Sequence, residues 1–254
     1  MMDNSAHFLA ALLDMGEIML QSGAEVNRVE TTITHMAQAY GFTKFDVFTI
    51  TSCIIITAHE EDGNILTQCR HVKGYDTNLN KIERCNAISR EYCENKMTVT
   101  ELHERIKNVR EEQTYPLWAY FLLYGMGAAV FTGFFGGGFM DMLAAMIGGF
   151  WVRIVQMTGR RLKVQNIVLT LVCSLASALL VVGMVHLGLG EATDKIVMGN
   201  IMLLIPGIAL TSSVRDLISG DLISGMLGVC EAVVRAVAIA AGVALVAWMM
   251  GGVL

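Results

Sequence analysis

An acid and a base lie one helical turn apart inside a long apolar segment near the C-terminus. In GVCEAVVRAVAIAAG, Glu231 and Arg235 follow the start of the run from Leu222 to Met250 by about 9 and 13 residues, or roughly 14 and 20 Å of helix. Charges at such depth are costly alone, so they are expected to pair and to mark a pathway. We interpret Glu231 as a proton-coupling candidate and Arg235 as a carboxylate-binding candidate. The alternatives are a structural ion pair, or a cytoplasmic start with the true span at 236–254.

A proline interrupts the preceding apolar segment, MGNIMLLIPGIALTSSVRDLISGD. Pro206 removes a backbone donor and frees the carbonyl one turn earlier, and each unsatisfied backbone group costs several kcal/mol in lipid. A kink repaired by neighbouring helices explains this pattern, and so does a discontinuous span that exposes polar backbone to a cavity. The candidate substrate-binding positions around this break are Asn200, Pro206, Gly207, Thr211, Ser212, Arg215 and Asp216. For Arg215 and Asp216, a solvated pair at the cytoplasmic end is the alternative.

Asp141 is the second proton-coupling candidate. Two spans between Leu117 and Val152 cannot both fit without including this residue, which we expect near the outer end of the second span. Arg153, on the same segment, is expected to extend its long side chain toward the cytoplasmic face.

The charges that these segments lack are concentrated in the first half of the chain. Residues 1–116 hold 28 of the 41 charged side chains, 17 of them acidic, and residues 117–254 hold 13. With 54% hydrophobic residues and a mean hydropathy of +0.53, the chain is too apolar for one soluble domain. We therefore predict a cytosolic domain at 1–115 and a membrane domain at 116–254. The acidic surplus argues against nucleic acid as a partner.

The second half predicts five transmembrane helices, because a span needs about 20 apolar residues. Basic residues that mark cytoplasmic loops follow the second span, at Arg160, Arg161 and Lys163. The start of the chain shows no secretory signal, so the N-terminus is expected in the cytoplasm and the C-terminus outside. The predicted spans are 117–135, 139–158, 164–188, 196–213 and 222–250.

The first half predicts a small α+β domain. Apolar spacing over residues 6–40 indicates two helices, interrupted at SGAE and closed by Gly41. β-branched residues around an EDGN turn indicate a β-hairpin, and residues 78–110 return to a helical pattern. Glu25, Arg28 and Glu30 cluster at a helix start, where capping and a surface ion pair explain them.

Catalytic and cofactor signatures are lacking. The sequence has no HExxH, GxSxG or GxxxxGK[ST] spacing, which argues against an enzyme and against ATP as an energy source. The six cysteines form no CxxC pair or metal-ligand spacing, so we expect buried free thiols and neither a metal site nor a cofactor.

Four stretches together resemble the bacterial threonine/serine exporter family, specifically its larger, N-terminal subunit type. They are LQSGAEVNRVETTITHMAQAYGF, the strand FDVFTITSCIIIT, GYDTNLNKIERCNAISR and LLIPGIALTSSVRDLISGDLISGMLGVCEA. The resemblance implies proton-driven export of small amino acids or, in some relatives, dicarboxylates. It also implies two recurring motifs, one at Gly23, Glu25, Arg28 and Glu30, and one at Pro206, Gly207, Arg215, Asp216 and Gly220.

The function expected from these observations is a proton-coupled secondary exporter, or a subunit of one, in a bacterial plasma membrane. Arg215 or Arg235 would meet a substrate carboxylate, while Glu231 or Asp141 would carry the proton. Because many relatives fuse a second membrane half, the resemblance implies a separate small subunit, and a homo-oligomer is also open. The rival hypothesis is a membrane-tethered enzyme or sensor that acts through its soluble domain.

Overall fold

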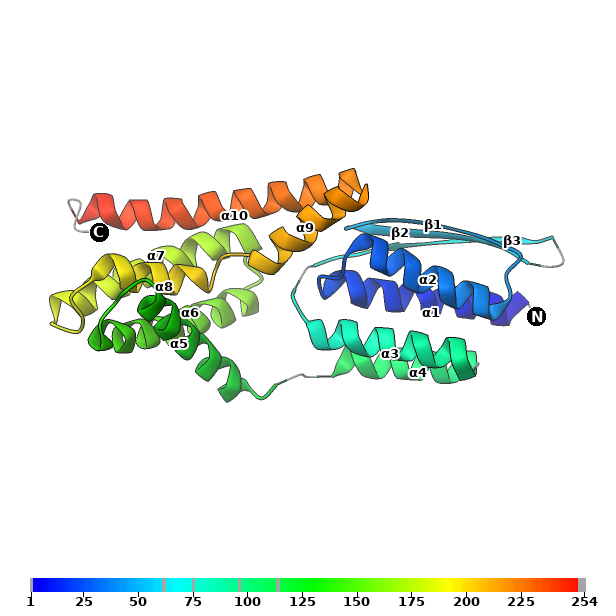
Figure 1. Cartoon of the computed structure of the whole chain (residues 1–254), viewed down its shortest axis with the longest axis horizontal. Helices are drawn as coiled ribbons and strands as arrows, with labels where there is room; N and C mark the ends of the chain where they lie inside the picture. Colours follow the sequence, from blue (N-terminus) through cyan, green and yellow to red (C-terminus); the bar gives the residue numbers. More distant parts are fainter. Residues whose placement is uncertain (1, 61–62, 75, 96, 113–114, 251–254) are drawn as a thin grey trace. The chain divides into compact units, whose positions relative to one another are not determined.

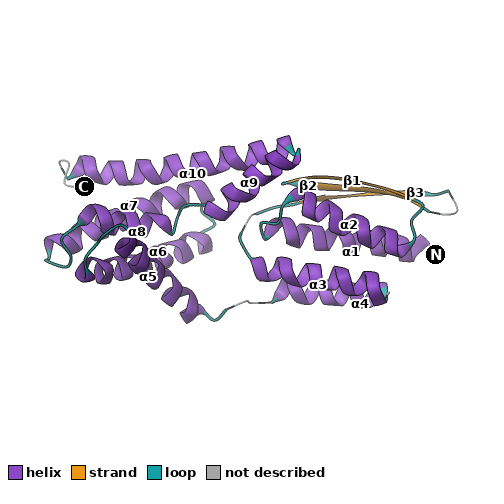
Figure 2. Ribbon diagram, in the orientation of Figure 1, coloured by secondary structure: helices purple, strands orange, loops and turns teal. Residues whose placement is uncertain are grey.

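The computed structural model describes the chain except residues 1, 61–62, 75, 96, 113–114 and 251–254. Helices dominate, with one small sheet (Figure 2). The contacts form two compact units. One comprises Met1–Thr114 and Gly207–Cys230, and the other comprises Tyr115–Pro206 and Glu231–Leu254. The predicted domains at 1–115 and 116–254 stay a prediction, and the sequence does not suggest that 207–230 packs with the N-terminal residues.

The N-terminal unit is built in three layers, with a sheet over α1 and α2 and with α3 and α4 beneath (Figure 1). The antiparallel sheet has the order β1-β2-β3. The elements are α1 Met2–Gln21, α2 Val26–Tyr40, β1 Lys44–Ile50, β2 Cys53–His59, β3 Ile65–His71, α3 Leu79–Asn95 and α4 Val99–Glu111.

The core of this unit centres on α1, which contacts both the sheet and the α3–α4 layer. Helix α1 is therefore apolar around much of its circumference, and Phe8, Leu12 and Met19 are fully buried. On β2, Ile54 and Ile56 point into the core, as the twofold alternation of strand side chains requires. Each such side chain contributes about 1.5–3 kcal/mol through burial.

Several elements match their sequence patterns. The two helices over 6–40 are α1 and α2, and Gly41 closes α2 with a φ of +104°. The predicted hairpin is confirmed as β2–β3. The stretch FDVFTITSCIIIT is not one strand, however, because the chain turns at Thr51–Ser52 and pairs Ile50 with Cys53. This turn lacks glycine and asparagine, so the sequence gives no strong signal for it.

The expectation of buried thiols is only partly correct. All six cysteines are free, but only Cys85 and Cys173 are buried. Cys53 and Cys69 lie on neighbouring strands at the outer face of the sheet, with their sulfur atoms 3.5 Å apart.

The apolar helices follow α4 in the chain, and most of them belong to the second unit. Four helices in the described part of the chain are long and apolar enough to cross a membrane, and a fifth span exists only if α8 and α9 count as one. The fourth predicted span, 196–213, is therefore two separate helices, and α9 groups with the N-terminal unit. The helices are α5 Leu117–Phe134, α6 Phe139–Arg161, α7 Asn166–His186, α8 Thr193–Met202, α9 Gly207–Ser219 and α10 Leu222–Met249.

Candidate functional site

Two motifs that are far apart in the sequence meet between α2 and α9. Glu25 is the residue before α2, and its carboxylate pairs with the Arg215 guanidinium of α9 at 2.5 Å. The two residues are 190 positions apart. The Arg215 side chain is 63% exposed, so water screens this ion pair and its contribution to stability is about 0–1 kcal/mol. The arrangement leaves an acid and a base accessible side by side.

Asp216, the neighbour of Arg215, is buried and has a structural partner. Its Oδ1 accepts a hydrogen bond from the backbone N–H of Val26 at 3.2 Å, while Glu25 makes no side-chain capping bond. A carboxylate in this position satisfies a free helix N–H and interacts favourably with the positive end of the helix. The structure thus places Asp216 as a cap of α2, contributed by α9.

Glu30 anchors the same helix to the sheet. Its Oε1 accepts a hydrogen bond from the backbone N–H of Thr49 at 2.8 Å. Burial raises the pKa of Glu30, the Thr49 N–H opposes this shift, and the carboxylate of Asp221 adds to it. Asp221 Oδ2 is itself buried without a hydrogen-bond partner among the described residues.

Two of the three motif glycines permit sharp turns beside these contacts. Gly23, between α1 and α2, has a φ of +88°, and Gly220, after α9, has a φ of +98°. Side-chain-bearing residues rarely adopt this left-handed region, whereas glycine does so without steric cost. The glycines therefore permit the change of chain direction between α1 and α2 and the one after α9.

A cavity of about 480 Å³ opens at this junction. It combines an acid, a base, two hydroxyl groups and the start of α9, where backbone N–H groups lack helical partners. The Thr211 hydroxyl donates to Gly207 O, and Ser212 lines the wall beside it. The lining residues are Glu25, Gly207, Ile208, Thr211, Ser212 and Arg215, which include four of the predicted substrate-binding positions.

A neighbouring cavity of about 260 Å³ shares Glu25, Ile208 and Ser212 with the first. It also contains Arg28, the remaining member of the first motif, and Arg90 of α3. Neither arginine forms an ion pair within the part of the chain that the structure describes. The wall therefore carries two arginines that are outside any such ion pair, together with the carboxylates of Glu25 and Glu83.

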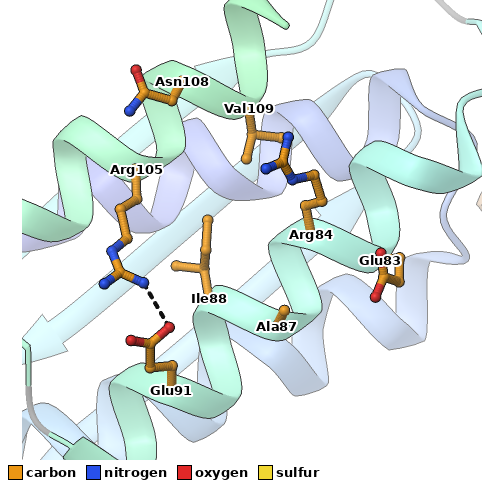
Figure 3. A pocket seen from close by; sticks show the side chains of 8 residues that line it. All are labelled: Glu83, Arg84, Ala87, Ile88, Glu91, Arg105, Asn108 and Val109. Carbon is orange, nitrogen blue, oxygen red and sulfur yellow. Dashed lines mark hydrogen bonds and ion pairs between the residues drawn. The ribbon is translucent and has the colours of Figure 1, made fainter. Parts of the chain in front are cut away.

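A third hollow lies between α3 and α4 and has a volume of about 370 Å³ (Figure 3). Its two arginines are already engaged, because Arg105 binds Glu91 at 2.6 Å and Arg84 pairs with Glu112. This hollow is accordingly a salt-bridged helix interface and a weak candidate for a ligand site.

The break predicted at Pro206 is present, since α8 ends at Met202 and α9 begins at Gly207. Asn200, one turn before the break, is fully buried in the second unit. Its Nδ2 donates to Ile196 O at 3.0 Å, and its Oδ1 has no partner among the described residues. Gly148 packs against the Asn200 amide, and a side chain at position 148 would clash with it, because a Cβ on Gly148 would lie 2.5 Å from Asn200 Nδ2.

Glu231 and Arg235 form the predicted ion pair along α10, at 2.5 Å. The Glu231 side chain is 50% exposed and that of Arg235 is 18% exposed. Helix α10 has 28 residues, or about 42 Å, and exceeds the roughly 30 Å of a hydrocarbon core. Part of the helix must therefore extend beyond the core, and the pair lies in its first half.

Asp141 has the contacts of a structural carboxylate. Its Oδ2 accepts from Gly138 N–H at 2.8 Å, and its Oδ1 accepts from the N–H groups of Glu191 and Ala192 at 2.7 and 3.1 Å. These bonds cap α6 and fasten the loop before α8 to it. Of the two carboxylates nominated for proton coupling, Glu231 is the one that forms an ion pair among the described residues.

Two features of the structure lie outside the sequence-based candidates. The first feature is the buried carboxylate oxygen of Asp221. Asp221 directly follows the motif glycine Gly220, and this position is the signal in the sequence that could have identified it. The second feature is the contact of Arg153 with Tyr120 and Tyr124, for which the helical spacing of the two tyrosines gives only a weak signal.

Comparisons with known proteins match exporters and transporters, whose names give different substrates. The ThrE family, described as "Putative threonine/serine exporter", matches residues 10–250. A Mycobacterium tuberculosis protein named "Probable threonine/serine exporter" is 24% identical over 242 residues, which cover 90% of this chain and 44% of that protein. A Klebsiella aerogenes protein named "Probable succinate transporter subunit YjjP" is 22% identical over 238 residues, which cover 92% of this chain and 90% of that protein. No solved structure matches.

Proposed function

Because the chain belongs to the threonine/serine exporter family, we propose that it is a proton-coupled secondary exporter, or a subunit of one, for small amino acids such as threonine and serine. The proposal places it in a bacterial plasma membrane with the N-terminus in the cytoplasm and the C-terminus outside. The family and the four long apolar helices support membrane transport, and the direction, coupling and substrate are our proposal.

The observation that carries the substrate assignment is the cavity that contains Glu25 and Arg215. A zwitterionic amino acid can exchange the internal ion pair for two new ones, with its ammonium on Glu25 and its carboxylate on Arg215. The N–H groups at the start of α9 offer further donors to the carboxylate. Ser212 lies within reach of a substrate hydroxyl, and the volume of about 480 Å³ is in the usual range for small-molecule sites.

The proposed coupling group is Glu231. When it is ionised it binds Arg235, and when it takes up a proton it releases that arginine. A charge that is alternately paired and released gives a helix two arrangements that a proton gradient can bias. In this proposal, Arg235 then becomes available to a substrate carboxylate.

The test is efflux from vesicles that contain the full chain, driven by a pH gradient. We expect Glu25→Gln and Arg215→Gln to raise the half-saturating threonine concentration about tenfold, and Glu231→Gln to abolish the dependence on the gradient. The exposed Glu104→Gln and Arg161→Gln serve as matched controls. Unchanged threonine efflux in both cavity variants would remove the cavity from the function.

A dicarboxylate is the second candidate substrate, and the neighbouring cavity favours it. A second carboxylate requires a second cation, which Arg28 and Arg90 can supply next to Arg215. Succinate should then compete with threonine for efflux in the wild type, and Arg28→Gln should weaken succinate competition more than threonine transport.

A membrane-tethered enzyme or sensor remains the rival from another class. Because Asp216 caps α2, the N-terminal unit must be tested with α9 present. Binding or turnover of a metabolite by the full chain, without any transport in vesicles, would favour this rival.

The proposed partner is a separate small membrane subunit. The name of the Klebsiella aerogenes relative includes the word subunit, and the chain spans less than half of the Mycobacterium tuberculosis relative. Solute loss from cells that express this chain with and without such a subunit tests the need for it. Crosslinking of the chain alone tests for a homo-oligomer.

A further inference from the structure

Arg153 of α6 holds its guanidinium against two aromatic rings of α5. The guanidinium carbon lies 4.7 Å from the centre of the Tyr120 ring and 5.3 Å from that of Tyr124. The Tyr124 hydroxyl donates to Gln156 Oε1 at 2.9 Å, which fixes the second ring. Cations over aromatic faces are attracted by the ring quadrupole. These contacts therefore position the guanidinium without neutralising it.

No acid compensates this charge within the described part of the unit. The acids there are Asp141, Glu191, Asp194 and Glu231, and none forms an ion pair with Arg153. Asp141 is occupied by backbone N–H groups, and Glu231 binds Arg235. The Nε atom of Arg153 is inaccessible to solvent and has no acceptor among the described residues. Because Arg153 is half-buried and its Nε lacks an acceptor, an anion beside the guanidinium would supply the missing hydrogen bond.

Both helices place the cluster at the same level. Tyr124 lies about 7 residues after the start of α5, and Arg153 lies about 8 residues before the end of α6, so each is roughly 10–12 Å from that end of its helix. In a hydrocarbon core of about 30 Å, this depth is off-centre. Arg153 and Tyr124 would thus lie about 3–5 Å from the midplane of such a core, while Tyr120, closer to the start of α5, lies nearer the polar face.

We propose that Arg153 and Tyr120 form a binding site for a single oxyanion group, supplied by the carboxylate of the transported solute or by the phosphate of a lipid headgroup with a net negative charge, in which no headgroup ammonium compensates the phosphate. The Tyr120 hydroxyl makes no hydrogen bond with the described residues and provides a second donor beside the guanidinium. The solute form of this proposal rests on the proposed function, whereas the lipid form does not.

The test measures thermal unfolding of the purified full chain in phosphatidylcholine nanodiscs. It uses an Arg215→Gln background, which removes the guanidinium of the α2–α9 cavity and separates the two proposals. Threonine is compared with threoninol, which lacks the carboxylate. In a parallel arm, phosphatidylglycerol replaces phosphatidylcholine, and native mass spectrometry counts the retained lipid. Equilibrium binding is measured in both arms, so failure of transport does not affect them.

We expect one probe, threonine or phosphatidylglycerol, to stabilise the protein. Arg153→Gln should weaken its binding about tenfold and Tyr120→Phe about threefold, because the phenylalanine keeps the ring but loses the donor. Arg161→Gln should change nothing. If Arg153→Gln fails to fold, Arg153→Lys retains the charge and should weaken binding about threefold. Equal binding of both probes by the Arg153 and Arg161 variants would mean that Arg153 is only an anchor, and the proposal would be wrong.

Discussion

Asp216 of α9 accepts a hydrogen bond from the backbone N–H of Val26, the first residue of α2, across 190 positions of sequence. Most helix caps come from the residue that directly precedes the helix. Here that residue, Glu25, directs its carboxylate to Arg215 instead. The capping group and the exposed ion pair are therefore supplied by consecutive residues of α9, and loss of either should have a different consequence.

Removal of the cap should reduce stability. We expect Asp216→Ala to lower the free energy of unfolding by about 0.5–2 kcal/mol, because the Val26 N–H loses its acceptor. Asp216→Asn keeps an oxygen at the same place and should cost less. Unfolding by denaturant in detergent measures the difference, and the exposed Asp46→Ala is the control. Equal stability of the Asp216 and Asp46 alanine variants would contradict the capping role.

The turn at Gly220 should depend on its backbone conformation alone. A Cβ added there meets no atom within 4 Å, so no clash competes with the strain of a φ of +98°. Gly220→Ala should therefore cost about 1–2 kcal/mol. Gly183 offers a matched control, since it lies within α7 with equally open surroundings, and alanine there should stabilise the protein by about 0.5–1 kcal/mol. Unfolding temperatures that move in the same direction for both variants would refute this reasoning.

Gly148 and Asn200 should be energetically coupled. Gly148→Ala pushes a methyl group against the Asn200 amide, and overpacking of this kind costs about 1–3 kcal/mol. Asn200→Ala removes both the clash and an oxygen without a hydrogen-bond partner among the described residues. The double variant should thus be more stable than the sum of the single losses predicts, as a double-mutant cycle of unfolding free energies can measure. Strict additivity would show that the two residues do not interact.

The partly buried carboxyl group of Glu30 should make the stability of the protein depend on pH. Its pKa is raised in the folded protein, chiefly by burial, so the folded state binds this proton more tightly than the unfolded state does. The resulting stabilisation is complete below the unfolded pKa and is lost as pH rises through the folded pKa. Glu30→Gln keeps an acceptor for the Thr49 N–H but cannot ionise. It should therefore be at least as stable as the wild type at neutral pH, and the difference should disappear in acid.

Measurement of the unfolding temperature at several pH values checks this expectation. The difference between wild type and Glu30→Gln isolates this one carboxylate, because every other acid is common to both proteins. A variant that is less stable than the wild type at neutral pH would show that the charged form of Glu30 is needed, contrary to the burial argument.

Sequence patterns predict the local structure of this chain better than its long-range contacts. Helix periodicity and Gly41 define α1 and α2, and Pro206 marks the break between α8 and α9. The turn at Thr51–Ser52 was missed because it contains neither the glycine nor the asparagine that typically marks a two-residue hairpin turn. The contacts of Asp216 with Val26 and of Asp141 with the loop at Glu191 depend on which helices meet, and one sequence carries no information on that pairing. Proton coupling by Asp141 is predicted because two spans between Leu117 and Val152 cannot fit without this residue, and it stays a prediction. Its three N–H donors become visible only in the structure.

The orientation of the Glu25–Arg215 pair separates a structural role from a substrate-binding role. Either single charge reversal, Glu25→Arg or Arg215→Glu, places like charges together and should reduce both stability and efflux. The double variant restores opposite charges, so its stability should return to within about 1 kcal/mol of the wild type, which is the range for an exposed pair.

The positive group of the double variant, however, now precedes α2 and its negative group lies on α9. A zwitterion held by the N–H groups at the start of α9 cannot satisfy this reversed pattern, so threonine efflux should stay impaired. Parallel measurement of unfolding and vesicle efflux decides the matter, because recovery of both would make the pair a simple tether between α2 and α9.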